Sequence, residues 1–173
     1  TWEWDFTNNG SVDNTSQNAT NLYPSDGTYD VELTVTTQEG CAGSIVQTVT
    51  VLELPVAIFN VSQECQGVAT QFTDASTTAS GTITNWAWDF TNNGSVDNIT
   101  QNPNNLMGPS GNYTTSLTVT TSNGCSSSTT NAVTVDPLPV ASYTWTDVCE
   151  GLTMNFTDAS SVASGTIVDY QWD

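Results

Sequence analysis

The chain contains no lysine, arginine or histidine among its 173 residues, whereas aspartate and glutamate together number 18, for a formal net charge of −18. Without cationic side chains it cannot neutralise phosphates, which excludes nucleic acids and anionic membranes as direct electrostatic partners. Only solvent ions or bound cations can screen the repulsion between its carboxylates. Because charged residues are just 10% of the chain, Thr, Ser, Asn and Gln must supply most of the polar surface. Such a surface indicates an extracellular, cell-surface protein.

The same absences remove most catalytic chemistry. A serine or cysteine nucleophile has no histidine or lysine to act as its base, and an oxyanion would find only backbone donors. Paired aspartates could serve a glycosidase, but here they lie in a repeated loop, and enzymes rarely duplicate an active site in identical copies. The sequence also lacks an apolar run of about 18 residues, the minimum for a membrane span. We therefore expect no catalytic residues, no enzyme activity and no membrane insertion in this segment.

What the sequence does contain is a tandem repeat. The eleven residues from Trp4 to Asn14 return unchanged from Trp88 to Asn98 and begin again at Tyr170, so the period is 84 residues. A unit of this size can hold one small core. A sequence that opens and closes within a repeat is expected of a segment of a longer array. The expected division is the C-terminal part of one repeat at 1–54, a complete repeat at 55–138, and the N-terminal part of a third at 139–173.

Within one unit the residue pattern predicts strands and no helix. In residues 29–36 apolar residues alternate with Asp, Glu and Thr, and residues 113–120 repeat this pattern with Thr and Ser, except that Thr115 takes one apolar position. The segment Ser122-Asn123-Gly124 predicts a hairpin turn. About seven short strands per unit predict a two-sheet antiparallel sandwich. The expected core residues are Trp86, Trp88, Phe90, Tyr113, Leu117 and Val119.

Four motifs resemble, in their order, the polycystic kidney disease (PKD) domain family. They are Pro55-Val-Ala-x-Phe59, Phe72-Thr-Asp-x-Ser76, Trp86-x-Trp88-Asp89-Phe90 and Gly27-x-Tyr29-x-Val31-x-Leu33-Thr-Val35-Thr. The resemblance implies an all-β, immunoglobulin-like antiparallel β-sandwich in tandem copies. The family is common in surface proteins of bacteria and archaea, and the added cysteines resemble PKD units of large secreted proteins of Bacteroidetes-type bacteria. One departure is the family's usual Gly-Asp-Gly turn, which here reads Thr-Asn-Asn-Gly.

The repeated turn is also a candidate calcium loop. It follows the spacing Asp-x-[Asp/Asn]-x-[Asp/Asn]-Gly, in which alternate side chains converge on a hard cation while glycine permits a sharp turn. Position 12 is Ser16 or Thr100 rather than glutamate, so two carboxylates per loop would bind calcium weakly. The second interpretation is that Asp89 caps the backbone amides of a tight turn. The candidate ligands are Asp5, Thr7, Asn9, Ser11, Asp13, Asp89, Thr91, Asn93, Ser95 and Asp97.

The four cysteines favour disulfides over zinc, because the chain has no Cys-x-x-Cys pair and no histidine. Within the complete unit the natural pair is Cys65 with Cys125, although an immunoglobulin-like topology would place them at opposite ends. Linking Cys41 to Cys65 is less favourable, because the chain between them runs outward through a strand and a linker. Free thiols, or bridges between neighbouring domains or chains, are the alternatives for these residues and for Cys149.

Composition alone does not decide whether the chain carries asparagine-linked glycans. A chain rich in Asn, Thr and Ser produces many Asn-x-Ser/Thr sequons by chance, so glycosylated and unmodified surfaces are both compatible with the sequence. The sequons begin at Asn9, Asn14, Asn18, Asn60, Asn93, Asn98, Asn112 and Asn155.

Together these features predict a non-enzymatic structural repeat of an extracellular surface protein, such as an adhesin shaft, a stalk or a filament subunit. Pro137 and Pro139 restrict the linker between units and predict a semi-rigid row. The expected partners are neighbouring repeats, identical chains in a fibre and surface glycans, and Ca²⁺ is the one candidate cofactor. The alternative is a carbohydrate-binding or spacer accessory module of a secreted hydrolase.

Overall fold

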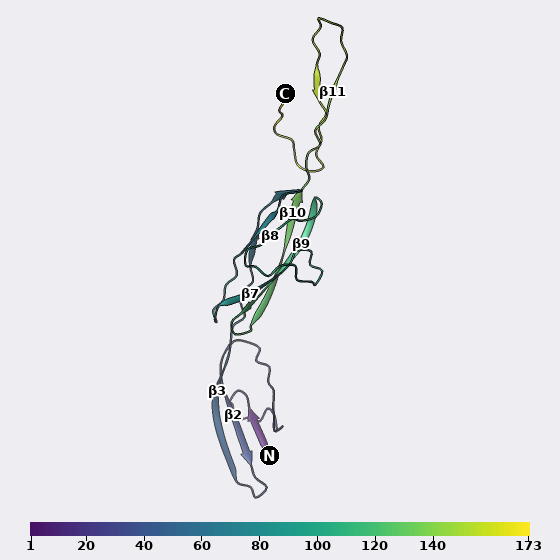
Figure 1. Ribbon diagram of the computed structural model, residues 1–173. Helices are drawn as coiled ribbons and strands as arrows, with labels where there is room; N and C mark the ends of the chain where they lie inside the picture. The colour runs from purple at the N-terminus through teal and green to yellow at the C-terminus, as the bar shows by residue number, and fades with distance from the viewer.

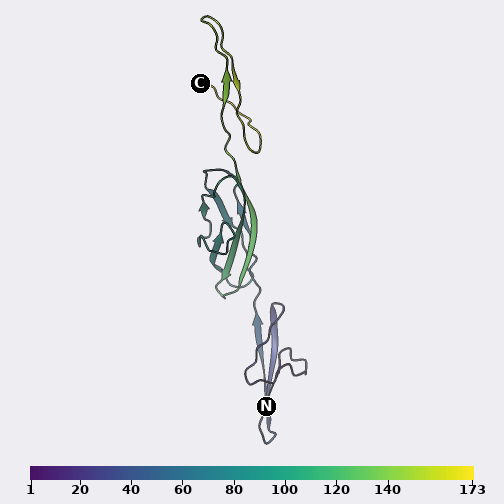
Figure 2. The same cartoon turned by 90° about the vertical axis from the view of Figure 1, so that its right-hand side faces the viewer.

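The computed structural model describes residues 1–173 as strands and loops, without any helix. No segment therefore forms a helix that could cross a membrane. The strands fall into three units that follow one another along one long axis, with the two termini in the units at opposite ends (Figures 1 and 2). The first unit contains β1 (Trp2–Asp5), β2 (Gly27–Thr36) and β3 (Ala42–Val51), and the third contains β11 (Tyr143–Trp145) and β12 (Phe156–Asp158).

The middle unit is a sandwich of two sheets. Its strand orders are β5-β10-β9-β7 and β4-β6-β8. All pairs are antiparallel except β5 with β10, which is parallel. The predicted all-β antiparallel sandwich is thus confirmed, with one parallel pair that the sequence pattern did not indicate. The strands are β4 (Phe59–Val61), β5 (Glu64–Cys65), β6 (Thr70–Asp74), β7 (Ile83–Asp89), β8 (Asn104–Asn105), β9 (Gly111–Thr121) and β10 (Ser126–Asp136).

The long β9–β10 hairpin follows directly from local sequence. Alternate side chains of β9, including Leu117 and Val119, are buried, while the residues between them are partly exposed, as period-two patterning requires. The turn is closed by Gly124, whose N–H donates to the Thr121 carbonyl at 2.9 Å. Its φ of 85° lies in the left-handed region that suits glycine. The same hairpin recurs as β2 and β3 in the first unit.

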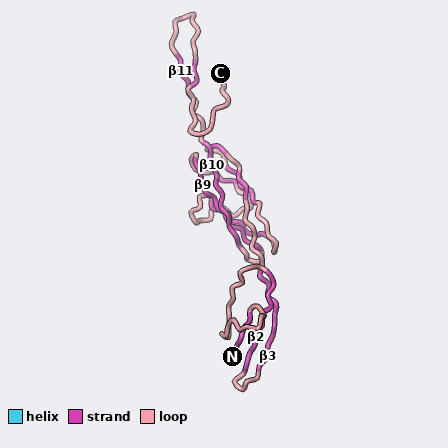
Figure 3. Tube along the Cα trace, turned by 180° about the vertical axis from the view of Figure 1, so that it is seen from behind, coloured by secondary structure: helices cyan, strands magenta, loops and turns pink.

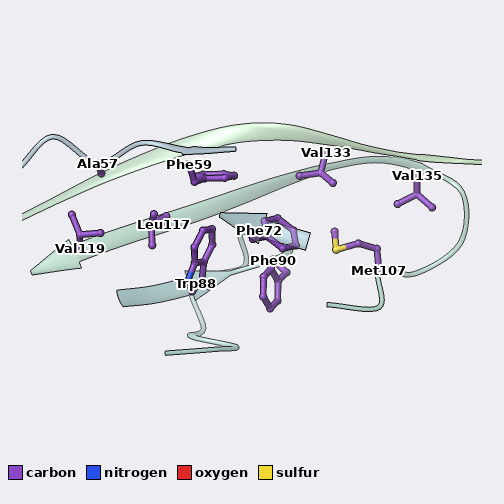
Figure 4. Packing of buried hydrophobic residues seen from close by; sticks show 10 residues of the cluster. All are labelled: Ala57, Phe59, Phe72, Trp88, Phe90, Met107, Leu117, Val119, Val133 and Val135. Atoms are coloured by element: carbon purple, nitrogen blue, oxygen red, sulfur yellow. The ribbon is translucent and has the colours of Figure 1, made fainter. Parts of the chain in front are cut away.

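The hydrophobic core lies between the two sheets of the middle unit (Figure 4). The Phe72 ring lies 5.5 Å from that of Trp88 and 4.8 Å from that of Phe90, measured between centroids. Trp86 and Tyr113 are partly buried and pack against the edge of this cluster. The cluster comprises Ala57, Phe59, Phe72, Trp88, Phe90, Met107, Leu117, Val119, Val133 and Val135.

The two end units contribute nothing to this core, since every member lies between residues 57 and 135. Comparing residues 84 positions apart shows which side chains are buried in the middle unit but exposed in the end units. Phe72 is fully buried, whereas its counterpart Phe156 is exposed, and Val119 is fully buried, whereas its counterpart Val35 is exposed. These two positions are buried only where both sheets are present, whereas Asp5 and Phe6 are buried like their counterparts Asp89 and Phe90.

Candidate functional site: the repeated aspartate turn

The turn begins where β7 ends and closes back on the same strand. The Trp88 N–H donates to the Asn98 carbonyl at 2.9 Å, and the Asp97 N–H donates to the Trp88 carbonyl at 2.7 Å. In the first unit the Trp4 N–H donates to the Asn14 carbonyl at 2.8 Å in the same way. Because the two copies share their sequence, they share this closed loop.

The carboxylate of Asp89 lies at the centre of the loop. It is buried and accepts backbone N–H bonds from Thr91 at 3.3 Å, from Asn93 at 3.1 Å and from Gly94 at 2.7 Å. In the first copy Asp5 accepts from Thr7 and Gly10. The carboxylate thus satisfies amides that a tight turn would otherwise leave unpaired.

A second carboxylate supports the loop from its far side. Oδ2 of Asp97 accepts the Phe90 N–H at 2.8 Å, and Oδ2 of Asp13 accepts the Phe6 N–H at 2.7 Å. The Asn93 side chain accepts the Ser95 N–H at 2.8 Å. Most of the proposed calcium ligands are therefore acceptors for the loop's own backbone.

Calcium coordination would need about six to eight oxygens directed at one point. In this chain no group of three or more Asp, Glu or Cys side chains lies close enough to hold a metal ion. The hydrogen bonds of Asp89 are those of a residue that caps a turn, and calcium binding by two carboxylates with Asn, Ser and Thr oxygens stays a prediction.

The acidity of these aspartates follows from the same contacts. Burial would raise the pKa of Asp89, but backbone N–H groups of residues 91–94 lower it by more, so its pKa lies below the ordinary value. The pKa of Asp5 is lowered for the same reason, by the N–H groups of residues 7–10. A chain without basic side chains thus stabilises a buried charge with backbone dipoles.

Two residues of the turn adopt left-handed backbone conformations. Asn92 has a φ of 52° and Gly94 a φ of 89°. Asparagine and glycine are the residues that tolerate this region best. Asn8 and Gly10 repeat these values, with φ of 51° and 84°, which gives the Thr-Asn-Asn-Gly departure a conformational explanation.

A third aspartate forms a network that the sequence reasoning missed. Oδ2 of Asp74 accepts the indole N–H of Trp86 at 2.8 Å and the side-chain amide of Gln101 at 3.1 Å, while Oδ1 accepts the Ser76 N–H at 3.0 Å. Burial raises the pKa of Asp74, but bonds from Ser76, Gln101 and Trp86 lower it by more, to below its ordinary value. The sequence signal for this network is the motif Phe72-Thr-Asp-x-Ser76, which recurs 84 residues later with Asp158 at the position of Asp74.

The fold is that of a known family. The family model for the PKD domain matches residues 1–52 and 53–136, which is most of the chain. The chain belongs to the PKD domain family. This confirms the resemblance read from the four motifs. The PKD domain is a non-catalytic module, typically structural or a spacer.

Two solved structures are similar to the chain. The PKD1 domain of Vibrio anguillarum Epp is 30% identical, and the match covers 49% of this chain and 95% of that one, with a TM-score of 0.44. The PKD1 domain from the Vibrio cholerae metalloprotease PrtV is 28% identical, over 49% of this chain and 99% of that one, also with a TM-score of 0.44. A comparison with curated proteins finds no match.

The PKD sandwich separates the two cysteines of the middle unit. Cys65 pairs with Asp136 at one end of β10, whereas Cys125 immediately precedes the other end of this 11-residue strand. At about 3.3 Å per residue the two are about 35 Å apart, but a disulfide needs Cα atoms within about 7 Å. The fold is therefore incompatible with the Cys65–Cys125 bridge, and all four cysteines, including Cys41 and Cys149, are free thiols.

The sequon asparagines lie mostly on the surface of the PKD units. Asn14 and Asn98 are half-buried, and the other six are exposed. The Asn98 side chain accepts bonds from both the N–H and the hydroxyl of Thr100 at 2.8 Å. The Asn112 side chain accepts the Thr134 hydroxyl at 3.0 Å. The exposed sequons leave room for a glycan without disturbing the core.

Proposed function

We propose that this chain is a non-enzymatic structural segment of an extracellular surface protein, in which PKD units in a row form a shaft, stalk or filament. The observation that carries the proposal is the end-to-end arrangement of the units (Figures 1 and 3). The last strand of each unit, β3 and then β10, leads directly into the next unit. Each added repeat therefore increases length rather than bulk.

The junctions are short and anchored on both sides. Only residues 137–139 lie between Asp136, the last residue of β10, and Val140, which exchanges backbone bonds with Ser161 at 2.7 and 3.0 Å. Two of those three linker residues are prolines, Pro137 and Pro139. Proline fixes φ and leaves few alternative conformations, which supports a semi-rigid row.

The surface of the middle unit favours a structural role over sugar binding. None of its exposed large hydrophobic side chains is aromatic. Trp88 is fully buried, and Trp86 is partly buried and donates its indole N–H to Asp74. A carbohydrate-stacking platform requires an exposed ring, so the carbohydrate-binding alternative has no counterpart in this unit. The other form of that alternative, a spacer module of a secreted hydrolase, would use the same end-to-end row of units.

The proposed location and partners of the chain follow from its polar surface. A surface of Thr, Ser, Asn and Gln without basic residues suits an extracellular setting. The partners in this proposal are neighbouring PKD repeats, together with glycans on the exposed sequons. Its cysteines, at the ends of the units, are free to link neighbouring domains or chains.

The proposal is tested by the stiffness of a junction. Cys125 and Cys149 lie on either side of the second linker and can carry a fluorescent donor and acceptor once Cys41 and Cys65 are replaced by serine. Single-molecule energy transfer should give one narrow, low-efficiency population. Pro137→Gly with Pro139→Gly should broaden it and shift it to higher efficiency, because glycine restores flexibility.

The matched control is Gln38→Gly with Asn18→Gly, which adds two glycines in exposed loops away from the linker. It should leave the distribution unchanged. A native chain whose distribution is already as broad as that of the linker variant would refute the semi-rigid shaft.

A further inference from the structure

The chain contains three Asn-Gly pairs, and two of them lie in the repeated aspartate turn. Asn9-Gly10 and Asn93-Gly94 occupy the same place in that turn, whereas Asn123-Gly124 lies in the turn between β9 and β10. An Asn-Gly pair is prone to deamidation, because glycine has no side chain to hinder attack of its backbone nitrogen on the neighbouring side-chain amide. All three asparagines are exposed, so burial does not distinguish them.

The reaction passes through a cyclic imide. The backbone nitrogen of the glycine loses its proton and attacks Cγ of the asparagine. A bond forms between that nitrogen and Cγ, the bond from Cγ to the amide nitrogen breaks, and ammonia leaves with the proton. Water then opens the five-membered imide at either carbonyl, which gives aspartate or isoaspartate. The reaction therefore depends on how readily the glycine N–H gives up its proton, as for any nucleophile that must be deprotonated.

In the aspartate turn of the middle unit a carboxylate holds that N–H. The Gly94 N–H donates to Oδ2 of Asp89 at 2.7 Å. A carboxylate stabilises the protonated amide, repels the anion that must form at the nitrogen, and is far too weak a base to remove an amide proton. The Asn93 side chain is also fixed, since its Oδ1 accepts the Ser95 N–H at 2.8 Å. These contacts oppose ring closure at Asn93.

The first copy of the turn has the same two contacts. The Gly10 N–H donates to Oδ2 of Asp5 at 2.7 Å, and the Asn9 side chain accepts the Ser11 N–H at 2.8 Å. Both Asn-Gly pairs of the repeated turn are therefore held in the same way.

The turn between β9 and β10 has no such charge beside its glycine. The Gly124 N–H donates to the neutral carbonyl of Thr121 at 2.9 Å. A hydrogen bond to a neutral carbonyl is roughly half as strong as one to a carboxylate, and it places no negative charge next to the nitrogen that must lose its proton. Ring closure at Asn123 is therefore opposed much less.

We propose that Asn123 is the site at which this chain deamidates first, and that the carboxylates of Asp5 and Asp89 protect Asn9 and Asn93 from the same reaction. The inference goes beyond the proposed function and does not depend on it. It gives the two aspartates a second role, because the bonds that cap the turn also preserve its asparagine.

The two products of deamidation should differ in their effect on the hairpin. The first unit carries Glu39 at the position of Asn123, so a carboxylate is compatible with this turn. Isoaspartate instead adds a methylene group to the backbone. The turn is tied to the segment before β7, where the Ser122 N–H donates to the Thr82 carbonyl at 2.8 Å. The isoaspartate product should therefore loosen this end of the middle unit.

The test is incubation of residues 1–173 at mildly alkaline pH with a chelator and a reducing agent, followed by pepsin digestion at low pH and mass spectrometry. Fragmentation of the peptides locates each modified asparagine. In the native chain Asn123 should deamidate at least about tenfold faster than Asn9 and Asn93, which corresponds to about 1.4 kcal/mol in activation free energy. In the chain unfolded in urea the three rates should become similar, since glycine follows each asparagine.

Two isosteric variants identify the protecting group. Asp89→Asn keeps the shape of the side chain and removes its charge, so Asn93 should deamidate about tenfold faster and approach the rate of Asn123. Asp97→Asn changes the other carboxylate of the loop, which accepts a different N–H, and should accelerate Asn93 much less. Asn9 is the internal control, because its own turn is unchanged in both variants.

Three results would overturn the inference. A native chain in which Asn93 deamidates as fast as Asn123 would show that the carboxylate protects nothing. An Asn123 that stays intact in the native chain, while the chain in urea deamidates, would show that the hairpin protects it equally well. A rate at Asn93 that Asp89→Asn leaves unchanged, or raises no more than Asp97→Asn does, would show that the charge of Asp89 is not the cause.

Discussion

Two fully buried threonines of the middle unit should respond in opposite directions to the same change. Thr70 and Thr115 are both 0% exposed, but Oγ1 of Thr70 has no hydrogen-bond partner, whereas Oγ1 of Thr115 donates to the Phe90 carbonyl at 3.0 Å. Valine keeps the shape of threonine and replaces the hydroxyl with a methyl group. Thr70→Val therefore removes an unsatisfied buried group, and Thr115→Val removes a satisfied one.

The magnitudes follow from the cost of burying a polar group. An unpaired buried hydroxyl costs about 1–3 kcal/mol, so Thr70→Val should raise the free energy of unfolding of the middle unit by about 1 kcal/mol or more. Thr115→Val loses a hydrogen bond and strands the Phe90 carbonyl, so it should lower the free energy by about 1–3 kcal/mol.

Native-state hydrogen exchange at Leu117 and Val119 measures this free energy, because these amides lie in the core strand β9 and report the opening of the middle unit rather than of the ends. Each variant is compared with the native chain at one pH and temperature. Protection that falls by a similar amount in both variants would show that Thr70 has a partner, and would refute the reasoning.

Three further predictions concern the core and the carboxylates. Trp88→Ala should cost about 3–5 kcal/mol in urea denaturation followed by circular dichroism, and Trp4→Ala clearly less, because Trp88 is fully buried and Trp4 only partly; equal costs would contradict the difference in burial. The pKa values of Asp5, Asp74 and Asp89 are lowered by folding, so the stability they add is fully present above about pH 4 and is lost as the pH falls through their lower folded values. Thermal melts from pH 7 to 2 in about 1 M salt, which screens the general repulsion, should therefore show a falling midpoint, and a midpoint that rises on acidification would be inconsistent with these shifts. At pH 7 the midpoint should rise between about 10 mM and 1 M sodium chloride because of the charge of −18, whereas a flat response would mean that self-repulsion is unimportant.

The strands and the aspartate turn could be predicted because their causes are local. Alternation of Leu117 and Val119 with polar residues determines both the strand and the face that it buries. The turn after Trp88 has nearly the same hydrogen bonds as the turn after Trp4, since nearly every donor and acceptor lies within about ten residues of its partner. The sequence left calcium binding and turn capping both open at this loop; the N–H groups that point at Asp89 show the capping bonds, and calcium binding stays a prediction.

Other features depend on residues that the sequence keeps far apart. The parallel pairing of β5 with β10 joins Cys65 to Asp136, and it places Cys65 and Cys125 at opposite ends of one strand. The network around Asp74 likewise collects Trp86 and Gln101 from other segments. No local pattern specifies these distances, because they depend on how the two sheets stack.

The sequence by itself determined the 84-residue period, the all-β class and the conformation of each turn, because repeated short segments make repeated local contacts. Only the tertiary structure decided which copies are buried. Trp4 and Trp88 begin the same eleven residues, yet only Trp88 is enclosed, because Phe59 and Phe72 of the opposing sheet cover it. The burial of this tryptophan therefore needs both sheets, whereas Phe6 and Phe90 are buried in both copies.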